Sequence, residues 1–242
     1  TVKIWDAQTG DEVFKLPTGP LEYQTVAFSP KSGRFLVTGR ADGKVQVWDA
    51  QPSPEAKLVS TLDSHGRTAI RAVVFSPDGR HLASASHDGV VKLWDATRLD
   101  QKQDARQTLQ ARSPVVPCLN VAFSPDGRRL ATGGEDNTVM IWDVQTAQEL
   151  QPPLRGHSGE IYAVAFSPDE DGRWIASAGE DSTVKIWDSH SGKLLRSFRG
   201  HTALVSSVAF SPDGRRLFSG SRDKTVKVWD LTQLSNEPPD RQ

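Results

Sequence analysis

The sequence is short of cysteine and methionine and contains no long apolar run. It has one cysteine, Cys118, and one methionine among 242 residues. A single cysteine excludes an internal disulfide and is too little for a cysteine-based zinc site. No apolar stretch approaches the roughly 18 residues that a membrane-spanning helix needs, and no Asn-X-Ser/Thr glycosylation site is present. These absences favour a cytoplasmic protein without a membrane span.

An excess of charge of either sign is also missing. Lys and Arg total 29 and Asp and Glu total 30, which gives a formal net charge of −1. A basic excess is the usual mark of nucleic-acid or membrane-surface binding, so neither partner is expected. The six histidines show no metal-ligand spacing. Because glycine-rich phosphate loops and Gly-X-Ser-X-Gly motifs are absent too, we expect no cofactor and no metal.

What the sequence does contain is a repeat. The dipeptide Trp-Asp begins at Trp5, Trp48, Trp94, Trp142, Trp187 and Trp229, in steps of 43, 46, 48, 45 and 42 residues. A second marker recurs in phase, as VAFSPDG at 121–127 and 208–214. Pro-Asp-Gly after a short apolar run favours a tight turn that closes a hairpin. Alternation ending in Trp, as in VKIW at 184–187, favours a strand. Each unit therefore predicts about four short strands.

This pattern resembles the WD-repeat (Trp-Asp repeat) β-propeller family across nearly the whole chain. The turns rich in Ser-Pro-Asp-Gly-Arg resemble those of bacterial members. The resemblance implies an all-β fold of four-stranded antiparallel blades. We expect 21 strands, which form complete blades at about 22–62, 70–109, 118–151 and 161–198 and part-blades at 1–16 and 205–230.

The strand count also bears on domain organisation. The repeat domain is expected to span 1–231, with a C-terminal tail at 232–242. Six blades of four strands need 24 strands and seven need 28, so 21 strands would leave a ring incomplete and its sheet edges exposed. We therefore expect a segment of a longer protein, in which a six- or seven-bladed ring is completed by missing sequence, a second copy or another chain.

The resemblance further implies a structural hydrogen-bond chain of His, Ser or Thr, Asp and Trp in each blade. The matching residues are Thr38, Asp42 and Trp48; Ser84, Asp88 and Trp94; Thr132, Asp136 and Trp142; Ser177, Asp181 and Trp187; and Ser219, Asp223 and Trp229. The histidine is present in three units, as His65, His157 and His201. Two units have LPTGPLEY and LQARSPVVPCL in its place, and their blades are expected to be less rigid, since an unpartnered buried polar group costs roughly 1–3 kcal/mol.

Ser, His and Asp together also suggest a catalytic triad. Three copies in register argue against this interpretation, because a nucleophile needs one privileged site with oxyanion donors. We therefore expect a structural role for these residues and no enzymatic activity.

Members of the resembled family usually bind partners on the face formed by the loops that enter the first strand and join the second to the third. The register places seven polar residues on this loop face: Arg71, His87, Glu135, Glu160, Tyr162, Glu180 and Arg222. Tyrosine and arginine are frequent in interface hot spots, and the glutamates favour a basic segment of a protein or peptide partner. Ordinary solvated surface is the alternative at each position.

The leading hypothesis is a non-catalytic interaction scaffold within a larger signalling or regulatory protein. A structural subunit that packs against another chain is the alternative. An enzyme that uses a central channel is a third hypothesis, but it would need clustered acids or a metal that the sequence does not offer.

Overall fold

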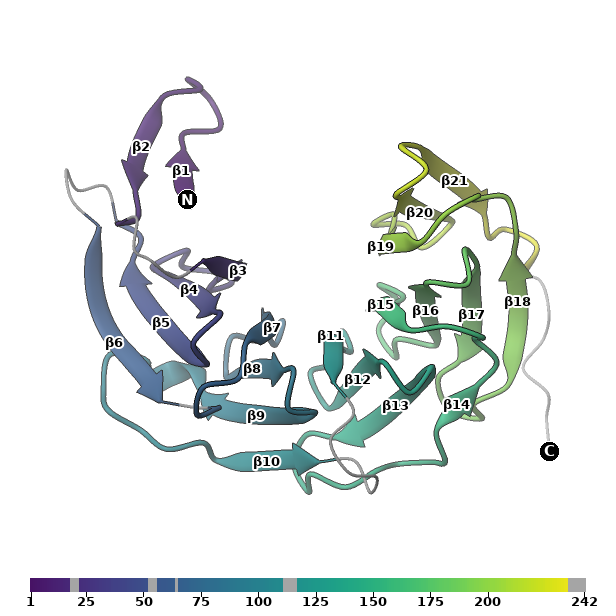
Figure 1. Ribbon diagram of the computed structural model, residues 1–242, viewed down its shortest axis with the longest axis horizontal. Coiled ribbons are helices and arrows are strands. Elements are labelled where there is room, and N and C mark those ends of the chain that lie inside the picture. Colours follow the sequence, from purple (N-terminus) through teal and green to yellow (C-terminus); the bar gives the residue numbers. More distant parts are fainter. Residues whose placement is uncertain (18–21, 52–55, 64, 111–116, 235–242) are drawn as a thin grey trace. The chain divides into compact units, whose positions relative to one another are not determined.

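The computed structural model describes residues 1–17, 22–51, 56–63, 65–110 and 117–234 (Figure 1). Regular structure in these residues consists of 21 β-strands and one short 3-10 helix at Ala96–Arg98. The chain divides into two compact units, Thr1–Cys118 and Leu119–Gln242. Within the described residues, no helix is long and apolar enough to cross a membrane.

The first unit contains three antiparallel sheets in which strands consecutive in sequence pair with each other. The smallest sheet has two strands, β1 (Lys3–Trp5) and β2 (Glu12–Lys15). The second sheet consists of β3 (Tyr23–Phe28), β4 (Phe35–Arg40), β5 (Lys44–Asp49) and β6 (Lys57–Asp63). The third consists of β7 (Ile70–Phe75), β8 (His81–Ser86), β9 (Val90–Asp95) and β10 (Gln107–Gln110).

The second unit repeats the same arrangement in two four-stranded sheets and one three-stranded sheet. The first is β11 (Cys118–Phe123), β12 (Arg129–Gly134), β13 (Thr138–Asp143) and β14 (Leu154–Arg155). The next is β15 (Ile161–Phe166), β16 (Trp174–Gly179), β17 (Val184–Asp188) and β18 (Leu194–Phe198). The last is β19 (Val205–Phe210), β20 (Arg216–Ser221) and β21 (Val226–Asp230), with β19 beside β15 (Figure 1).

The Ser-Pro-Asp-Gly segments close the hairpins between the first and second strands. In β11–β12, the Ser124 hydroxyl donates to Asp126 Oδ1 and accepts from the Arg129 backbone N–H at 2.9 Å. Gly127 has a φ of +71°, a left-handed conformation that glycine adopts without steric cost. The turn therefore satisfies its own polar groups and leaves the following strand in a defined register.

The core lies between successive sheets within each unit and consists mainly of aliphatic side chains, together with tryptophan and phenylalanine. In the second unit, Val184 and Ile186 of β17 pack in one buried cluster with Val205 and Leu217 of the next sheet. Burying each such side chain contributes roughly 1.5–3 kcal/mol. The alternating apolar residues of the third strand therefore pack one sheet against the next.

The predicted all-β class, with antiparallel four-stranded sheets and 21 strands, is confirmed in the described residues. The third predicted blade, placed at 118–151, instead reaches β14 at Leu154–Arg155. Pairing with β13 already occurs before the prolines, where Glu149 bridges to Trp142 and the Leu150 backbone N–H donates to the Ile141 carbonyl at 2.9 Å. Pro152 and Pro153 have no backbone N–H to donate and interrupt the ladder before β14. Of the predicted tail, residues 235–242 lie outside the described part of the chain.

Candidate functional site

A chain of four side chains runs through the sheet β15–β18. Trp187 Nε1 donates to Ser177 Oγ at 2.8 Å, His157 Nε2 lies 2.8 Å from the same oxygen, and His157 Nδ1 lies 2.9 Å from Asp181 Oδ2. An indole N–H can only donate, so the Ser177 oxygen accepts from it. The Ser177 hydrogen is then directed to Nε2, because Nδ1 must carry a hydrogen to face a carboxylate. Every donor in the chain thus points toward Asp181.

The last sheet holds a second copy with the same geometry. Trp229 Nε1 donates to Ser219 Oγ at 2.8 Å, and His201 Nε2 lies 2.8 Å from that oxygen. On the other side of the ring, Nδ1 lies 2.7 Å from Asp223 Oδ2, and the backbone N–H of Thr202 donates to the same carboxylate oxygen.

Both carboxylates are held in the ionised form. Burial of Asp181 opposes its ionisation, but hydrogen bonds from His157 and from the Ser158 backbone outweigh burial and hold the pKa well below its usual range. For Asp223, a hydrogen bond from Thr225 is the largest of several causes that lower the pKa. These two groups therefore carry full negative charge at neutral pH.

The copy in β7–β10 is looser at its acidic end. His65 Nε2 lies 2.9 Å from Ser84 Oγ, which also accepts from Trp94 Nε1 at 3.0 Å. The Nδ1 atom of His65, however, lies 3.5 Å from Asp88 Oδ2. Burial lowers the pKa of His65, and the nearby Asp88 carboxylate only partly opposes this effect. The folded chain therefore favours the neutral form of the buried His65 imidazole over the protonated form.

Two sheets lack the histidine but keep the Trp-to-Thr bond. Trp48 Nε1 donates to Thr38 Oγ1 and Trp142 Nε1 donates to Thr132 Oγ1, both at 3.0 Å. Parts of the segments predicted to replace the histidine, residues 18–21 and 111–116, lie outside the described residues.

Sequence reasoning missed a basic partner in the first of these two sheets. Arg40 Nε lies 3.3 Å from Asp42 Oδ1, and Arg40 also donates to Gln46 Oε1 at 3.3 Å. The signal available was an arginine two residues before Asp42, where the other sheets have serine or glycine.

A threonine two residues after the structural aspartate was missed as well. Its hydroxyl donates to the aspartate at 2.8 Å from Thr138 and Thr183, and at 2.6 Å from Thr225. The recurring Asp-X-Thr triplet was a usable signal, since a hydroxyl two residues away can complete a local turn.

The hydroxyls of these chains are buried, with 0 % exposure for Ser177 and 1 % for Ser219. A substrate has no access to such an oxygen, so the arrangement supports the sheets internally. Within the described residues, no group of three or more His, Cys, Asp or Glu side chains is placed to hold a metal ion.

Two glutamates meet at the loop end of the sheet β15–β18. Glu160 precedes β15 and Glu180 follows β16, and the Glu180 backbone N–H donates to the Glu160 carbonyl at 2.8 Å. A Cβ atom at Gly179 would lie 2.1 Å from that carbonyl oxygen. Glycine at this position is therefore what allows the two glutamate-bearing segments to approach each other.

Tyr162 joins this pair. Its hydroxyl donates to Glu160 Oε2 at 2.8 Å. The pKa of Tyr162 is raised, first by this hydrogen bond, then by burial and by the charges of Glu160 and Glu180, while the charge of Arg222 lowers it. The structure thus brings four of the seven predicted loop-face residues into one electrostatic environment, which we call the Tyr162 site: Glu160, Tyr162, Glu180 and Arg222.

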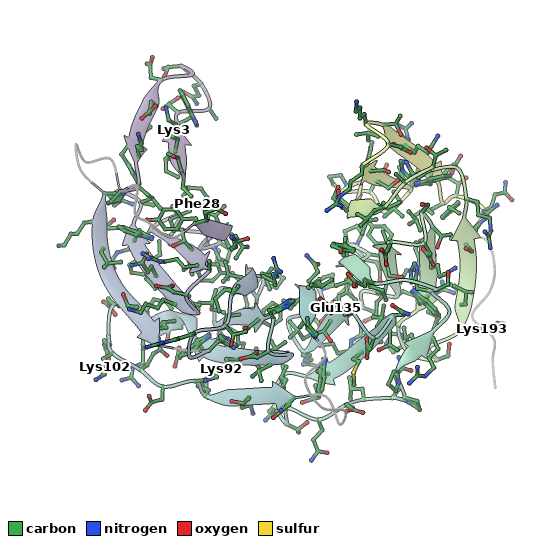
Figure 2. The ribbon with its side chains drawn as sticks, viewed as in Figure 1. Lys3, Phe28, Lys92, Lys102, Glu135 and Lys193 are labelled. Carbon is green, nitrogen blue, oxygen red and sulfur yellow. The ribbon has the colours of Figure 1, made fainter. Side chains whose placement is uncertain are left out.

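The other three predicted residues are not part of this cluster. Glu135 follows β12 in the second unit and is half-buried (Figure 2). Arg71 is exposed on β7, and His87 follows β8 and is half-buried; both belong to the first unit.

The Tyr162 site contains two carboxylates, those of Glu160 and Glu180, and one guanidinium, that of Arg222. Among the described residues, neither Glu160 nor Glu180 forms an ion pair with a lysine or arginine. Glu180 is exposed and Glu160 and Tyr162 are half-buried. The site therefore carries two negative charges and one positive charge beside an aromatic ring, a combination suited to a cationic ligand group.

Comparison with known proteins gives a consistent result. The family model described as "WD domain, G-beta repeat" matches residues 24–49, 56–95, 105–143, 148–188 and 192–230. A stretch of 56 residues is 38% identical to WD repeat domain-containing protein 83 of Danio rerio. This match covers 23% of the present chain and 17% of that relative, so it spans only a small part of the relative's length.

Proposed function

Because the chain belongs to the WD-repeat family, we propose that it is a non-catalytic interaction module whose Tyr162 site binds a basic segment of a partner protein. Domains of this family generally serve as protein-interaction scaffolds. The observation that carries the proposal is that the charges of Glu160 and Glu180 act on Tyr162, while neither carboxylate forms an ion pair with a lysine or arginine among the described residues.

Recognition at this site would combine charge and stacking. A lysine or arginine side chain would be attracted by the two carboxylates and by the face of the Tyr162 ring. Exposed ion pairs contribute only about 0.2–1 kcal/mol each, so one site of this kind supports modest, salt-sensitive affinity. The interface would therefore include further contacts on the loop face, with Glu135 as a third acidic group of the same unit.

Charge reversal tests the proposal. A fluorescent octalysine peptide serves as the probe, and its titration is compared for the unmodified chain and for variants with Glu135, Glu160 and Glu180 each changed to Lys. The combined Glu160→Lys and Glu180→Lys variant is expected to bind at least tenfold more weakly. Glu170→Lys, on the exposed hairpin turn at the opposite end of β15, is the matched control and should change little. Equal affinity in all variants would count against the site.

We also propose that the chain packs against a further WD-type blade, as expected for one segment of a larger regulatory protein. Three apolar side chains of the last sheet are exposed: Phe218 by 37%, Val226 by 70% and Val228 by 55%. The residues that match the two valines in the other sheets are buried: Val45, Val47, Val91, Leu93, Val139, Ile141, Val184 and Ile186.

The neighbouring sheet indicates what would cover this face. Val184 and Ile186 are buried against Val205 and Leu217, and aliphatic first and second strands of a further blade would cover the exposed valines of the last sheet in the same way. An exposed patch of this kind promotes association. Light scattering should therefore show concentration-dependent association that Val226→Lys reduces. A dispersed monomer that does not bind a hydrophobic dye would contradict this second proposal.

A further inference from the structure

A cavity of about 320 Å³ lies between the hairpin turns of the sheets β15–β18 and β19–β21. The turns are at the end of the strands opposite to Glu160, because β15 runs from the loop face to the hairpin. The cavity is lined by Pro168, Asp169, Arg173, Trp174, Pro212, Asp213 and Gly214.

The preceding junction, between β11–β14 and β15–β18, is bridged by an arginine at the equivalent position. Arg129, the first residue of β12, donates to Ser189 Oγ at 2.9 Å, to the Gly172 carbonyl at 3.4 Å and to the Asp171 carbonyl. Its guanidinium also lies 5.4 Å from the centre of the Phe166 ring. The Arg129 guanidinium thus links the sheet β11–β14 to the hairpin turn of the sheet β15–β18.

Trp174, the first residue of β16, occupies the position that Arg129 has in β12. Its side chain is almost fully buried, with 6% exposure, and its Nε1 atom has no hydrogen-bond partner among the described residues. An indole offers one donor on a rigid ring, in place of the five donors of a guanidinium. The bridge of the preceding junction is therefore absent here.

The hairpin turns at the Trp174 junction are also farther apart than those at the Arg129 junction. A Cβ atom at Gly172 would lie 2.8 Å from Pro125 Cδ, whereas one at Gly214 would lie 3.6 Å from Pro168. The turns next to Trp174 are thus less tightly packed than those bridged by Arg129.

The lining offers hydrogen-bond acceptors. Asp169 and Asp213 contribute two carboxylates, although the charges of Arg215 and Arg216 act on Asp213 and the guanidinium of Arg173 lies 5.8 Å from the centre of the Trp174 ring. In the described part of the chain, no donor reaches the carbonyl oxygens of Asp213 or Gly214, the counterparts of the Asp171 and Gly172 carbonyls that accept from Arg129. These two carbonyl oxygens are therefore free to accept hydrogen bonds from a guanidinium.

We propose that this cavity binds an arginine side chain of a partner protein, whose guanidinium takes the place that Arg129 holds at the preceding junction. The planar group donates to the carbonyls of Asp213 and Gly214 and to the Asp213 carboxylate, and its stem packs on Pro168 and Pro212. A lysine ammonium fits less well because it cannot make paired, planar contacts.

The probe is the capped tripeptide Gly-Arg-Gly, compared with Gly-Lys-Gly and Gly-Glu-Gly. Binding is followed through the indole N–H resonance of Trp174 in the isotope-labelled chain, with Trp174→Phe used for assignment. The arginine peptide is expected to give a saturable shift and at least fivefold tighter binding than the lysine peptide. Equal binding of the glutamate peptide, or no saturable shift with any peptide, would overturn the proposal.

Two variants separate this site from the Tyr162 site. Trp174→Arg restores the bridging residue and is expected to abolish peptide binding, which is measured by calorimetry in this variant because the Trp174 resonance is lost. Asp213→Asn keeps the shape of the turn and is expected to weaken binding at least threefold, which keeps the test valid if Trp174→Arg does not fold. Glu160→Lys is expected to leave tripeptide binding unchanged, and a loss of binding in that variant would place the arginine on the loop face instead.

Discussion

Nδ1 of His201 lies 2.7 Å from Oδ2 of Asp223. The corresponding pairs are 2.9 Å apart for His157 and 3.5 Å apart for His65. The same set of residue types thus forms two closed networks and one that is open at its acidic end.

The first prediction concerns the stability of these networks. His157→Gln removes two close contacts and is expected to lower the free energy of unfolding by about 2–4 kcal/mol, since each unsatisfied buried group costs roughly 1–3 kcal/mol. His65→Gln removes one close contact and is expected to cost about half as much. Urea denaturation of both variants measures the difference, and equal losses would show that the 3.5 Å separation has no energetic effect.

The pH dependence of His65 follows from its lowered pKa. Because the unfolded chain binds the proton more readily than the folded chain, this group stabilises the fold least at low pH. Its effect should appear as a loss of stability when the pH falls below about 6.5, the ordinary value for histidine. The free energy of unfolding should differ less between pH 8 and pH 5.5 in His65→Gln than in the unmodified chain. An equal pH-dependent change in the two proteins would contradict the prediction.

Asp181 should affect the stability of the fold in a lower pH range than His65 does. Its pKa is lower in the folded chain than in the unfolded chain, so its stabilisation is complete above about 3.9, the ordinary value for aspartate. It is lost progressively as the pH falls below that value toward the folded pKa. Asp181→Asn should therefore be less stable than the unmodified chain at pH 6, and the gap should narrow toward pH 3. A gap that is constant over this range would rule out the carboxylate charge as its source.

Gly179 provides a steric test of the Tyr162 site. Gly179→Ala places a methyl group 2.1 Å from the Glu160 carbonyl oxygen, and overpacking of this kind costs roughly 1–3 kcal/mol. Binding of the octalysine probe should weaken as well, because Glu160 must move. Gly10→Ala is the control, since a Cβ at Gly10 meets no atom within 4 Å and disturbs only a turn with a φ of +77°. Equal probe binding in Gly179→Ala would show that Glu160 does not depend on this contact.

The sheets themselves were predictable because their signals are local. Alternation such as that before Trp187 and the turns after Phe-Ser-Pro each determine the structure of a few neighbouring residues, and Phe-Ser-Pro recurs five times. The first strands of the sheets, with loop residues such as Glu160, could be placed by register alone.

Contacts made by long side chains were not predictable in this way. Arg40 and Arg129 reach partners whose position depends on how hairpins and neighbouring sheets pack, which the spacing of residues along the chain does not express. The same holds for the buried Trp174 N–H, since its lack of a partner is a property of the surroundings rather than of the residue. The interruption of the ladder before β14 has a simpler, local cause in Pro152 and Pro153.

The direction of hydrogen-bond donation from Trp187 to Asp181 has a consequence for the surface above it. The dipoles of the indole, hydroxyl and imidazole groups are aligned, and the aligned series ends in a carboxylate immediately after Glu180. Glu180 is exposed to solvent, whereas Asp181 accepts hydrogen bonds from the Ser158 backbone N–H and the Thr183 hydroxyl. The interior of the sheet therefore keeps the Asp181 carboxylate ionised and fixed in position next to Glu180, whatever conformation the surface side chains adopt.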